Sequence, residues 1–192
     1  MKAEDFALRL SVIKSENFRF ANGVDLRDDT NWREDRKKAL LRDNNTCAHC
    51  GFSSDKYMEV HHLNGDYMNN AVENLMTLCP FCHSCYHIGK ASVDNLGCLL
   101  VMNKNCDQAK LNRYLFELIK QYGENSVYAV ELVKEALPVE RDLGPEGLNM
   151  LANKLLAEKQ PIVTPANYIF FPFITKYRIT KYLIDKFSRK DK

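Results

Sequence analysis

Two short motifs, Cys47-Ala48-His49-Cys50 and Cys79-Pro80-Phe81-Cys82-His83, decide how the middle of this chain folds. Each contains a CxxC turn, or knuckle, which lets two thiolates approach one ion at about 2.3 Å, so two knuckles make a closed tetrahedral zinc site. Only 28 residues separate the knuckles, too few for a separate hydrophobic core. We therefore predict that these cysteines, Cys47, Cys50, Cys79 and Cys82, bind a structural Zn²⁺ that supplies folding energy to this segment.

Two alternatives to this ligand set remain open in the sequence. Cys79, Cys82 and Cys85 form overlapping CxxC pairs, so the second knuckle could instead use Cys82 with Cys85. We favour Cys79 with Cys82, because Pro80 suits both a tight turn and the first position of a helix. Disulfide pairing is the second alternative, but the cysteine count is odd and no leader-like segment begins the chain. These features favour reduced, metal-binding thiols and a cytoplasmic location, either free or docked on the inner face of a membrane through a partner.

The histidines predict a second metal site, because all five fall in the same segment as the knuckles. His83 and His87 are four residues apart, so their rings share a face if both lie on one helix. His61 can supply a third ligand. Its neighbour His62 should point to the opposite side of a strand, which lets one histidine bind metal while the other acts on a substrate. His49 has no partner at ligand spacing and is expected to be solvated.

This constellation resembles the HNH, or ββα-metal, nuclease family, which has a treble-clef-like zinc module. The matching residues are Cys47, Cys50, Glu59-Val60-His61-His62, Asn74-Leu75, Leu78-Cys79-Pro80-Phe81-Cys82-His83 and His87. The resemblance implies that His61 and His83 bind a catalytic divalent ion, which would be Mg²⁺, Mn²⁺ or a second Zn²⁺; His87 is either a further ligand or a packing residue. It also implies that His62 is the general base for hydrolysis of a DNA phosphodiester and that Asn74 braces the hairpin loop. The plainer alternative is a histidine pair that only packs on the hairpin.

Composition and net charge limit which classes of protein this chain can belong to. The 192 residues are 45% apolar, enough for one sizeable core, and the formal net charge is only +2. Dedicated DNA-binding proteins usually carry a strong basic excess, so DNA binding without catalysis is disfavoured. No stretch approaches the ~20 apolar residues of a membrane-spanning helix, so an integral membrane protein is not expected. Basic residues near the C-terminus are most simply a solvated helix end: Lys176, Arg178, Lys181, Lys186, Arg189, Lys190 and Lys192.

The pattern along the chain predicts an α+β protein in three parts that pack as one unit: residues 1–46, 47–90 (the zinc module) and 91–192. In the first part, residues 6–20 alternate like two short strands, and a helix capped at Thr30 or Asn31 should follow. The third part should open with a buried strand and continue mostly as helices. These elements are expected at residues 97–102 for the strand and about 111–122, 126–137, 145–159 and 175–187 for the helices.

The catalytic unit of an HNH-type nuclease would end near His87, so the third part of the chain is not needed for hydrolysis. Its aromatic run at 168–174 and its two cysteines, Cys98 and Cys106, are most simply core residues. The functional alternative is that the helices form a groove for a partner peptide or helix.

A second resemblance, to the IcmJ/DotN proteins of type IVB secretion systems, supports a binding role. It rests on Asn64-Gly65-Asp66-Tyr67-Met68-Asn69-Asn70, on Cys98-Leu99-Leu100-Val101-Met102 followed by Asp107-Gln108-Ala109-Lys110-Leu111-Asn112, and on Phe171-Pro172. It implies a component that is cytoplasmic or docked on the inner membrane through a secretion complex. Such a component holds the C-terminal segment of a DotL-like coupling ATPase, beside a DotM-like protein and adaptor chaperones, and helps recruit effectors. Catalysis is not this family's recognised role. We therefore expect a binding component first and an active endonuclease second.

Overall fold

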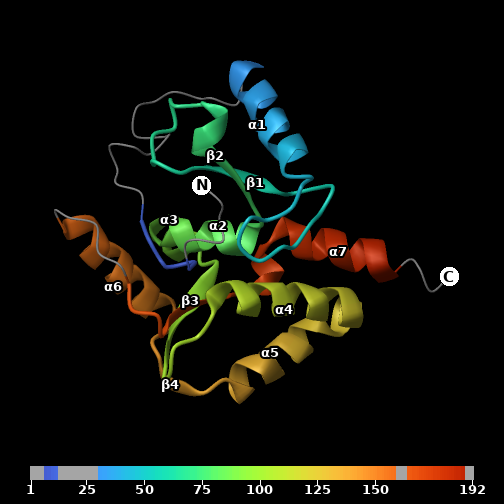
Figure 1. The fold of residues 1–192 in the computed structure, drawn as a ribbon. Helices are drawn as coiled ribbons and strands as arrows, with labels where there is room; N and C mark the ends of the chain where they lie inside the picture. Colours follow the sequence, from blue (N-terminus) through green and yellow to red (C-terminus); the bar gives the residue numbers. More distant parts are fainter. Residues whose placement is uncertain (1–6, 13–29, 159–163, 189–192) are drawn as a thin grey trace.

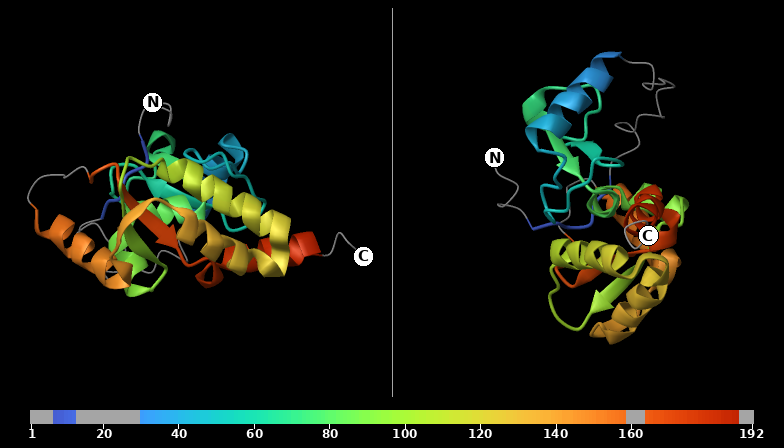
Figure 2. Two further views of the ribbon diagram at one scale, coloured as in Figure 1. Left: turned by 90° about the horizontal axis from the view of Figure 1, so that it is seen from below. Right: turned by 90° about the vertical axis from the view of Figure 1, so that its right-hand side faces the viewer.

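Two small antiparallel sheets with helices around them form the part of the chain that the computed structural model describes, residues 7–12, 30–158 and 164–188 (Figure 1). The mixed α+β class expected from the sequence is confirmed. In Figure 1, α1 and the first sheet lie at one end of the molecule and α4 and α5 at the other, with α2 and α3 between them. The right-hand view of Figure 2 shows the same separation of α1 from α4 and α5.

The first sheet pairs β1 (Glu59–His62) with β2 (Leu75–Leu78), in a register that sets Glu59 opposite Leu78 and His62 opposite Leu75. The connection contains Gly65, whose φ of 74° is in the left-handed region that glycine tolerates, and the 3-10 helix η4 (Val72–Asn74). The chain turns at residues 64–66, where the Gly65 N–H donates to the carbonyl of His62 at 3.0 Å.

Helix α1 (Thr30–Arg42) covers one face of this sheet and begins where the sequence predicts. Trp32 and Ala39 are buried and pack with Val60 and Leu75 in a small separate core. At the helix end, the Arg42 guanidinium donates hydrogen bonds to the carbonyls of Val72 (2.7 Å) and Leu75 (2.8 Å). These contacts attach α1 directly to the strand that precedes the second knuckle.

A helix follows the hairpin at once. Pro80 occupies the first turn of α2 (Pro80–Tyr86), where a missing N–H costs nothing and the fixed φ suits a helix. The chain breaks its helical conformation at His87 (φ −125°, ψ 45°) and resumes as α3 (Ile88–Val93). This break places His87 between two helices, not on one helix with His83 as predicted.

The second sheet has the strand order β4-β3-β5. Its central strand β3 (Gly97–Met102) is buried at every position, as its continuous apolar sequence predicts. The neighbours are β5 (Tyr168–Pro172), which is the predicted aromatic run and is largely buried, and β4 (Val139–Asp142). Sequence reasoning missed β4, because its residues Val-Glu-Arg-Asp are mostly exposed and polar and only backbone pairing to β3 makes them a strand.

The predicted helices of the third part are present. They are α4 (Gln108–Tyr122), α5 (Ser126–Ala136), α6 (Gly144–Ala157) and α7 (Arg178–Ser188), with short 3-10 helices η5 (Gly123–Asn125) and η6 (Ile174–Lys176). Helix α6 packs on β3 and α3, whereas α4 packs on α5 and α7. Asp107 caps α4, so the helix begins at Gln108 and not at about residue 111 as predicted. Gly123 follows the predicted end at residue 122 and stops the helix with a φ of 52°.

The first of the two expected N-terminal strands is a wrong prediction. Residues 7–12, the described part of the first expected strand, form no strand, although Leu8 and Leu10 are buried. The Ser11 N–H donates to the carbonyl of Cys85 (2.8 Å), and Leu10 bonds in both directions to the Thr164 hydroxyl. The alternating burial therefore reflects docking against helix ends. The second expected strand, at 17–20, lies outside the described residues.

Three stacked phenylalanine rings join the helical half to both knuckles. Phe116 of α4 lies between Phe52, at a centroid distance of 3.9 Å, and Phe81, at 4.2 Å. All three side chains are fully buried. One continuous core includes these rings and extends from Leu8 to Leu183.

Replacing Gly97 by alanine is expected to destabilise the protein by about 1–3 kcal/mol or more, because the added methyl overpacks the core. An alanine Cβ there would lie 2.5 Å from the carbonyl oxygen of Phe171 and 2.6 Å from the Phe170 ring. The matched control is Gly89→Ala in α3, whose Cβ would meet no atom closer than 3.9 Å and which should be neutral or stabilising. Urea unfolding of both variants checks the prediction, and equal stabilities would contradict it.

Candidate metal centre

Four cysteines from the two knuckles converge in the interior. One sulfur each from Cys47, Cys50, Cys79 and Cys82 lies within 4.8 Å of the other three, and the Cys50 and Cys79 sulfurs are 3.6 Å apart. Four thiolates at about 2.3 Å from one Zn²⁺ would be about 3.8 Å apart. The donor set and its spacing therefore fit a metal such as zinc. Cys85 is buried outside the cluster, with its thiol directed at the carbonyl of Phe81, so the register Cys79 with Cys82 is the one that converges.

Local backbone geometry turns each knuckle toward the cluster. In the first, Gly51 has a φ of 68°, and the Cys47 N–H donates to the carbonyl of Phe52 at 2.8 Å. In the second, Cys79 is the N-cap of α2, and its sulfur accepts a hydrogen bond from the Cys82 N–H at 3.4 Å. An N–H donor at the start of a helix favours negative charge on the sulfur.

Two buried polar side chains on α4 form hydrogen bonds that support the cysteine cluster. The Asn112 amide donates to the Cys82 sulfur at 3.3 Å, and Gln108 donates to the Asn112 side-chain oxygen at 2.9 Å. Gln108 also exchanges two hydrogen bonds with the backbone of Phe170 in β5. Such outer contacts orient metal ligands. Sequence reasoning assigned Gln108 and Asn112 no role of their own. Two polar residues four positions apart on an otherwise apolar helix face could have indicated that they are buried and hydrogen-bonded.

The thiols resist ionising together. Hydrogen bonds from Cys50, Cys79 and Cys82 lower the pKa of Cys47, whereas burial, reinforced by the neighbouring thiols, raises the pKa of Cys79 and Cys82. A divalent cation removes this penalty, because it neutralises the thiolates that it binds.

Three histidines form a second cluster, from β1, α2 and the junction at residue 87. One ring nitrogen each from His61, His83 and His87 lies within 4.8 Å of the other two, and the Nδ1 of His61 is 3.1 Å from the Nε2 of His87. Although His87 is off the helix, its ring still joins the group. The Nδ1 of His83 pairs with the carboxylate of Glu59, an arrangement typical of a histidine whose other nitrogen binds metal. Sequence reasoning assigned Glu59 no role of its own.

His62 points away from this cluster, as strand alternation predicts. Its ring stacks on Trp32 at a centroid distance of 5.0 Å, and its Nε2 lies 3.0 Å from the side-chain oxygen of Asn70. Asn74 holds the hairpin loop: its amide donates to the Asn64 side chain (3.0 Å) and the Asn69 carbonyl (2.8 Å). His49 differs from expectation. It is partly buried, which lowers its pKa, and its Nε2 lies 2.7 Å from the Tyr86 hydroxyl.

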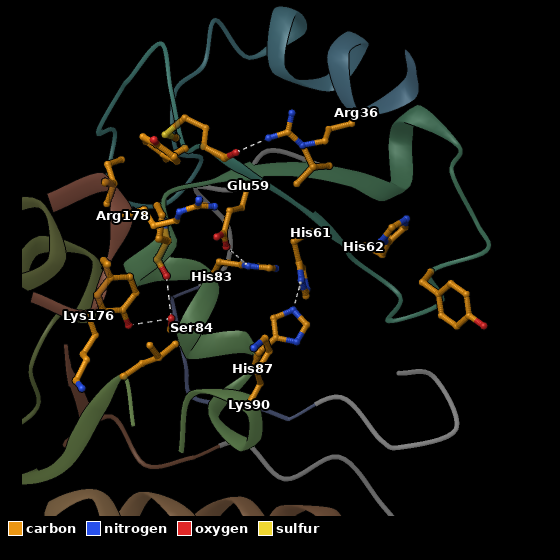
Figure 3. Close-up of a pocket in the computed structure, with 18 of the residues that line it drawn as sticks. Arg36, Glu59, His61, His62, His83, Ser84, His87, Lys90, Lys176 and Arg178 are labelled. Carbon is orange, nitrogen blue, oxygen red and sulfur yellow. Dashed lines mark hydrogen bonds and ion pairs between the residues drawn. The ribbon is translucent and has the colours of Figure 1, made fainter. Parts of the chain in front are cut away.

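A pocket of about 610 Å³ opens over the histidine cluster. Figure 3 shows Glu59 joined to His83 and His61 facing His87, with Arg178 and Lys176 along one side. The cysteine cluster does not line this pocket. The cysteine cluster is thus a closed site that suits a structural metal, and the histidine cluster is an open site that a ligand can reach.

Acid is expected to destabilise the fold through the histidine cluster. Burial and electrostatic repulsion from neighbouring histidines lower the pKa of His61 from 6.5 to about 2. Burial, with repulsion from His83 and Lys90, lowers the pKa of His87 from 6.5 to about 3. The unfolded chain therefore binds more protons below about pH 6.5, so the stability present above that pH is lost as the pH falls toward 3. The slope is up to about 1.4 kcal/mol per pH unit for each histidine.

Urea unfolding at fixed free zinc between neutral pH and the onset of acid denaturation measures this slope. His87→Gln should flatten it relative to wild type. Identical slopes in the two proteins would show that these histidines do not drive the acid sensitivity.

Fold and site together define an α+β protein with a cysteine cluster that can hold a metal. Over 85 residues the chain is 35% identical to the type 4 apparatus protein DotN of Legionella pneumophila subsp. pneumophila, which supports the predicted resemblance to DotN. The match covers 44% of this chain and 40% of that protein. No protein-family model matches the chain. Among the described residues, no helix has the length and apolarity needed to cross a membrane.

Proposed function

We propose that this protein is a DotN-like component of a type IV secretion apparatus, in which a zinc-stabilised module and the helical half together bind the C-terminal segment of a DotL-like coupling ATPase. The 35% identity to DotN over 85 residues carries this proposal. In this role the protein would lie on the cytoplasmic side, beside a DotM-like protein and adaptor chaperones, and help recruit effectors.

The helices α4 and α5 offer a surface suited to such a partner. They pack against each other and leave large apolar side chains exposed: Tyr114, Tyr122, Val127, Tyr128 and Leu132. Tyr128 is 71% exposed. Exposed aromatic side chains often supply most of the binding energy when a partner buries them. We therefore place the coupling-protein contact on the exposed surface of α4 and α5.

The test is a thermal-shift titration of the full chain with a peptide from the coupling ATPase C-terminus. At a hundredfold excess over the dissociation constant, binding stabilises by about 2.7 kcal/mol, or roughly 5–10 °C for a protein of this size. Tyr128→Asp should abolish the shift, whereas Met150→Asp, an exposed position on α6, should retain it. An unchanged melting temperature with saturating peptide would refute the proposed partner.

A second candidate function is a metal-dependent HNH endonuclease, which the histidine cluster favours. His61, His83 and His87 would hold a divalent ion, which supplies charge neutralisation at the phosphate and the leaving oxygen. His62 would accept the proton of the attacking water, with Asn70 orienting its ring. Asn74 would hold the loop that carries these groups.

Incubation with supercoiled plasmid in Mg²⁺, in Mn²⁺ and without added metal tests this candidate. His62→Ala is expected to lower the nicking rate by about 10²–10⁴-fold while the zinc content stays unchanged. Equal nicking by wild type and His62→Ala would indicate a contaminating nuclease, and no nicking by wild type would leave the module as a scaffold.

A further inference from the structure

The pocket over the histidines concentrates positive charge. Its lining includes four permanent cations, Arg36, Lys90, Lys176 and Arg178, against one carboxylate, Glu59. The whole chain has a formal net charge of only +2. The cations come from α1, α3, η6 and α7, so only the tertiary structure brings them together. An anion that enters this pocket is attracted from several directions.

Two of these cations are available for a ligand. Arg36 already donates to the carbonyl of Met58 at 2.7 Å, and Lys90 is paired with Asp94. Lys176 and Arg178 are exposed at the pocket and form no ion pair within the described part of the chain. Since no carboxylate must be displaced, their charges are free to act on an incoming anion.

The remaining lining suits the organic part of a ligand. Aromatic side chains contribute to the wall: Trp32, Tyr57, Tyr67 and Tyr177. The Arg178 guanidinium carbon lies 6.0 Å from the centre of the Tyr57 ring, so a cation and an aromatic face adjoin at the mouth. A volume of about 610 Å³ falls in the range of small-molecule sites.

We propose that this pocket binds a phosphate ester of nucleotide size, with Lys176 and Arg178 contacting the phosphate and the aromatic wall contacting the organic group. Arginine matches phosphate geometry through paired N–H donors, and lysine adds a point charge. This site goes beyond the proposed secretion role. It shares its pocket with the second candidate function, but it rests on Lys176 and Arg178, to which that function assigns no role, and it requires no catalysis. Loss of the coupling-protein interaction would therefore leave phosphate binding intact, and the reverse also holds.

Fluorescent N-methylanthraniloyl-AMP, titrated into the full-length protein, is the probe. Saturable binding is expected, weakening as ionic strength rises. Unlabelled AMP should displace the probe and adenosine should not, because the phosphate is the recognised group. Inorganic phosphate should displace the probe more weakly than AMP, because the aromatic wall contacts the organic group. Displacement by inorganic phosphate as effective as by AMP would overturn the proposed role of the aromatic wall.

Charge-reversal variants localise the binding. Lys176→Glu and Arg178→Glu should each weaken it about tenfold or more, since a charge-assisted hydrogen bond is lost and a repulsive charge gained. Lys181→Glu is the matched control, because it makes the same charge change at an exposed position of α7 that does not line the pocket. All three should keep the wild-type melting temperature and zinc content. The proposal is overturned if the three variants bind alike, if adenosine competes as well as AMP, or if wild type does not bind the probe.

Discussion

Replacing Cys79 by serine should reduce the tightly held zinc from about one equivalent per chain to near zero and unfold the zinc module. Cys79 is fully buried, and its sulfur belongs to the four-cysteine cluster. Structural zinc contributes about 10–16 kcal/mol to folding in small zinc domains, more than most proteins possess in total stability. Elemental analysis of purified protein and the loss of a cooperative thermal transition measure the two effects.

The matched control is Cys85→Ala. Cys85 is also fully buried and lies on α2, the helix that Cys79 caps, but its thiol is directed at the Phe81 carbonyl and belongs to no ligand cluster. This variant should retain its zinc and lose only about 1 kcal/mol or so of stability. Zinc retained in Cys79→Ser, or lost in Cys85→Ala, would mean that the ligand set differs from the one the geometry indicates.

Phe116→Ala should cost about 3–5 kcal/mol of stability, the second largest effect expected. The ring fills the space between Phe52 beside the first knuckle and Phe81 in the second, so its removal leaves a cavity that two separate segments line. The variant should also release zinc more readily to a chelator, because the rings attach both knuckles to α4.

Tyr114→Ala on the same helix serves as the control. This side chain is 51% exposed, so its removal should change the free energy of unfolding by about 0.5 kcal/mol or less. Urea denaturation of both variants gives the comparison. A Phe116→Ala protein as stable as Tyr114→Ala would show that the helical half and the zinc module are not energetically coupled through these rings.

The positive charge in the pocket is much higher than the net charge of the chain suggests. A net charge of +2 argued against DNA binding without catalysis, and the basic C-terminal run suggested a solvated helix end. Two members of that run, Lys176 and Arg178, instead line the pocket with Arg36 and Lys90. Net charge averages over the whole surface, whereas a ligand responds to the local field.

The sequence predicted local structure correctly where a few neighbouring residues are enough to determine it. The CxxC turns, the Pro80 helix start and the Gly123 stop all depend on contacts within one turn of chain, and the structure contains each. The same holds for β3, whose apolar run is buried throughout. The mixed fold class and the convergence of the four cysteines followed from these local patterns.

Tertiary packing decided what local patterns could not encode. Residues 7–12 alternate like a strand but have no strand partner and dock on helix ends instead, whereas β4 is polar and becomes a strand only because β3 offers its edge. Likewise, the contact of Asn112 with Cys82 and the pairing of Glu59 with His83 join residues 24 to 30 positions apart. Such contacts form because folding buries the groups together, and burial is a property of the whole molecule.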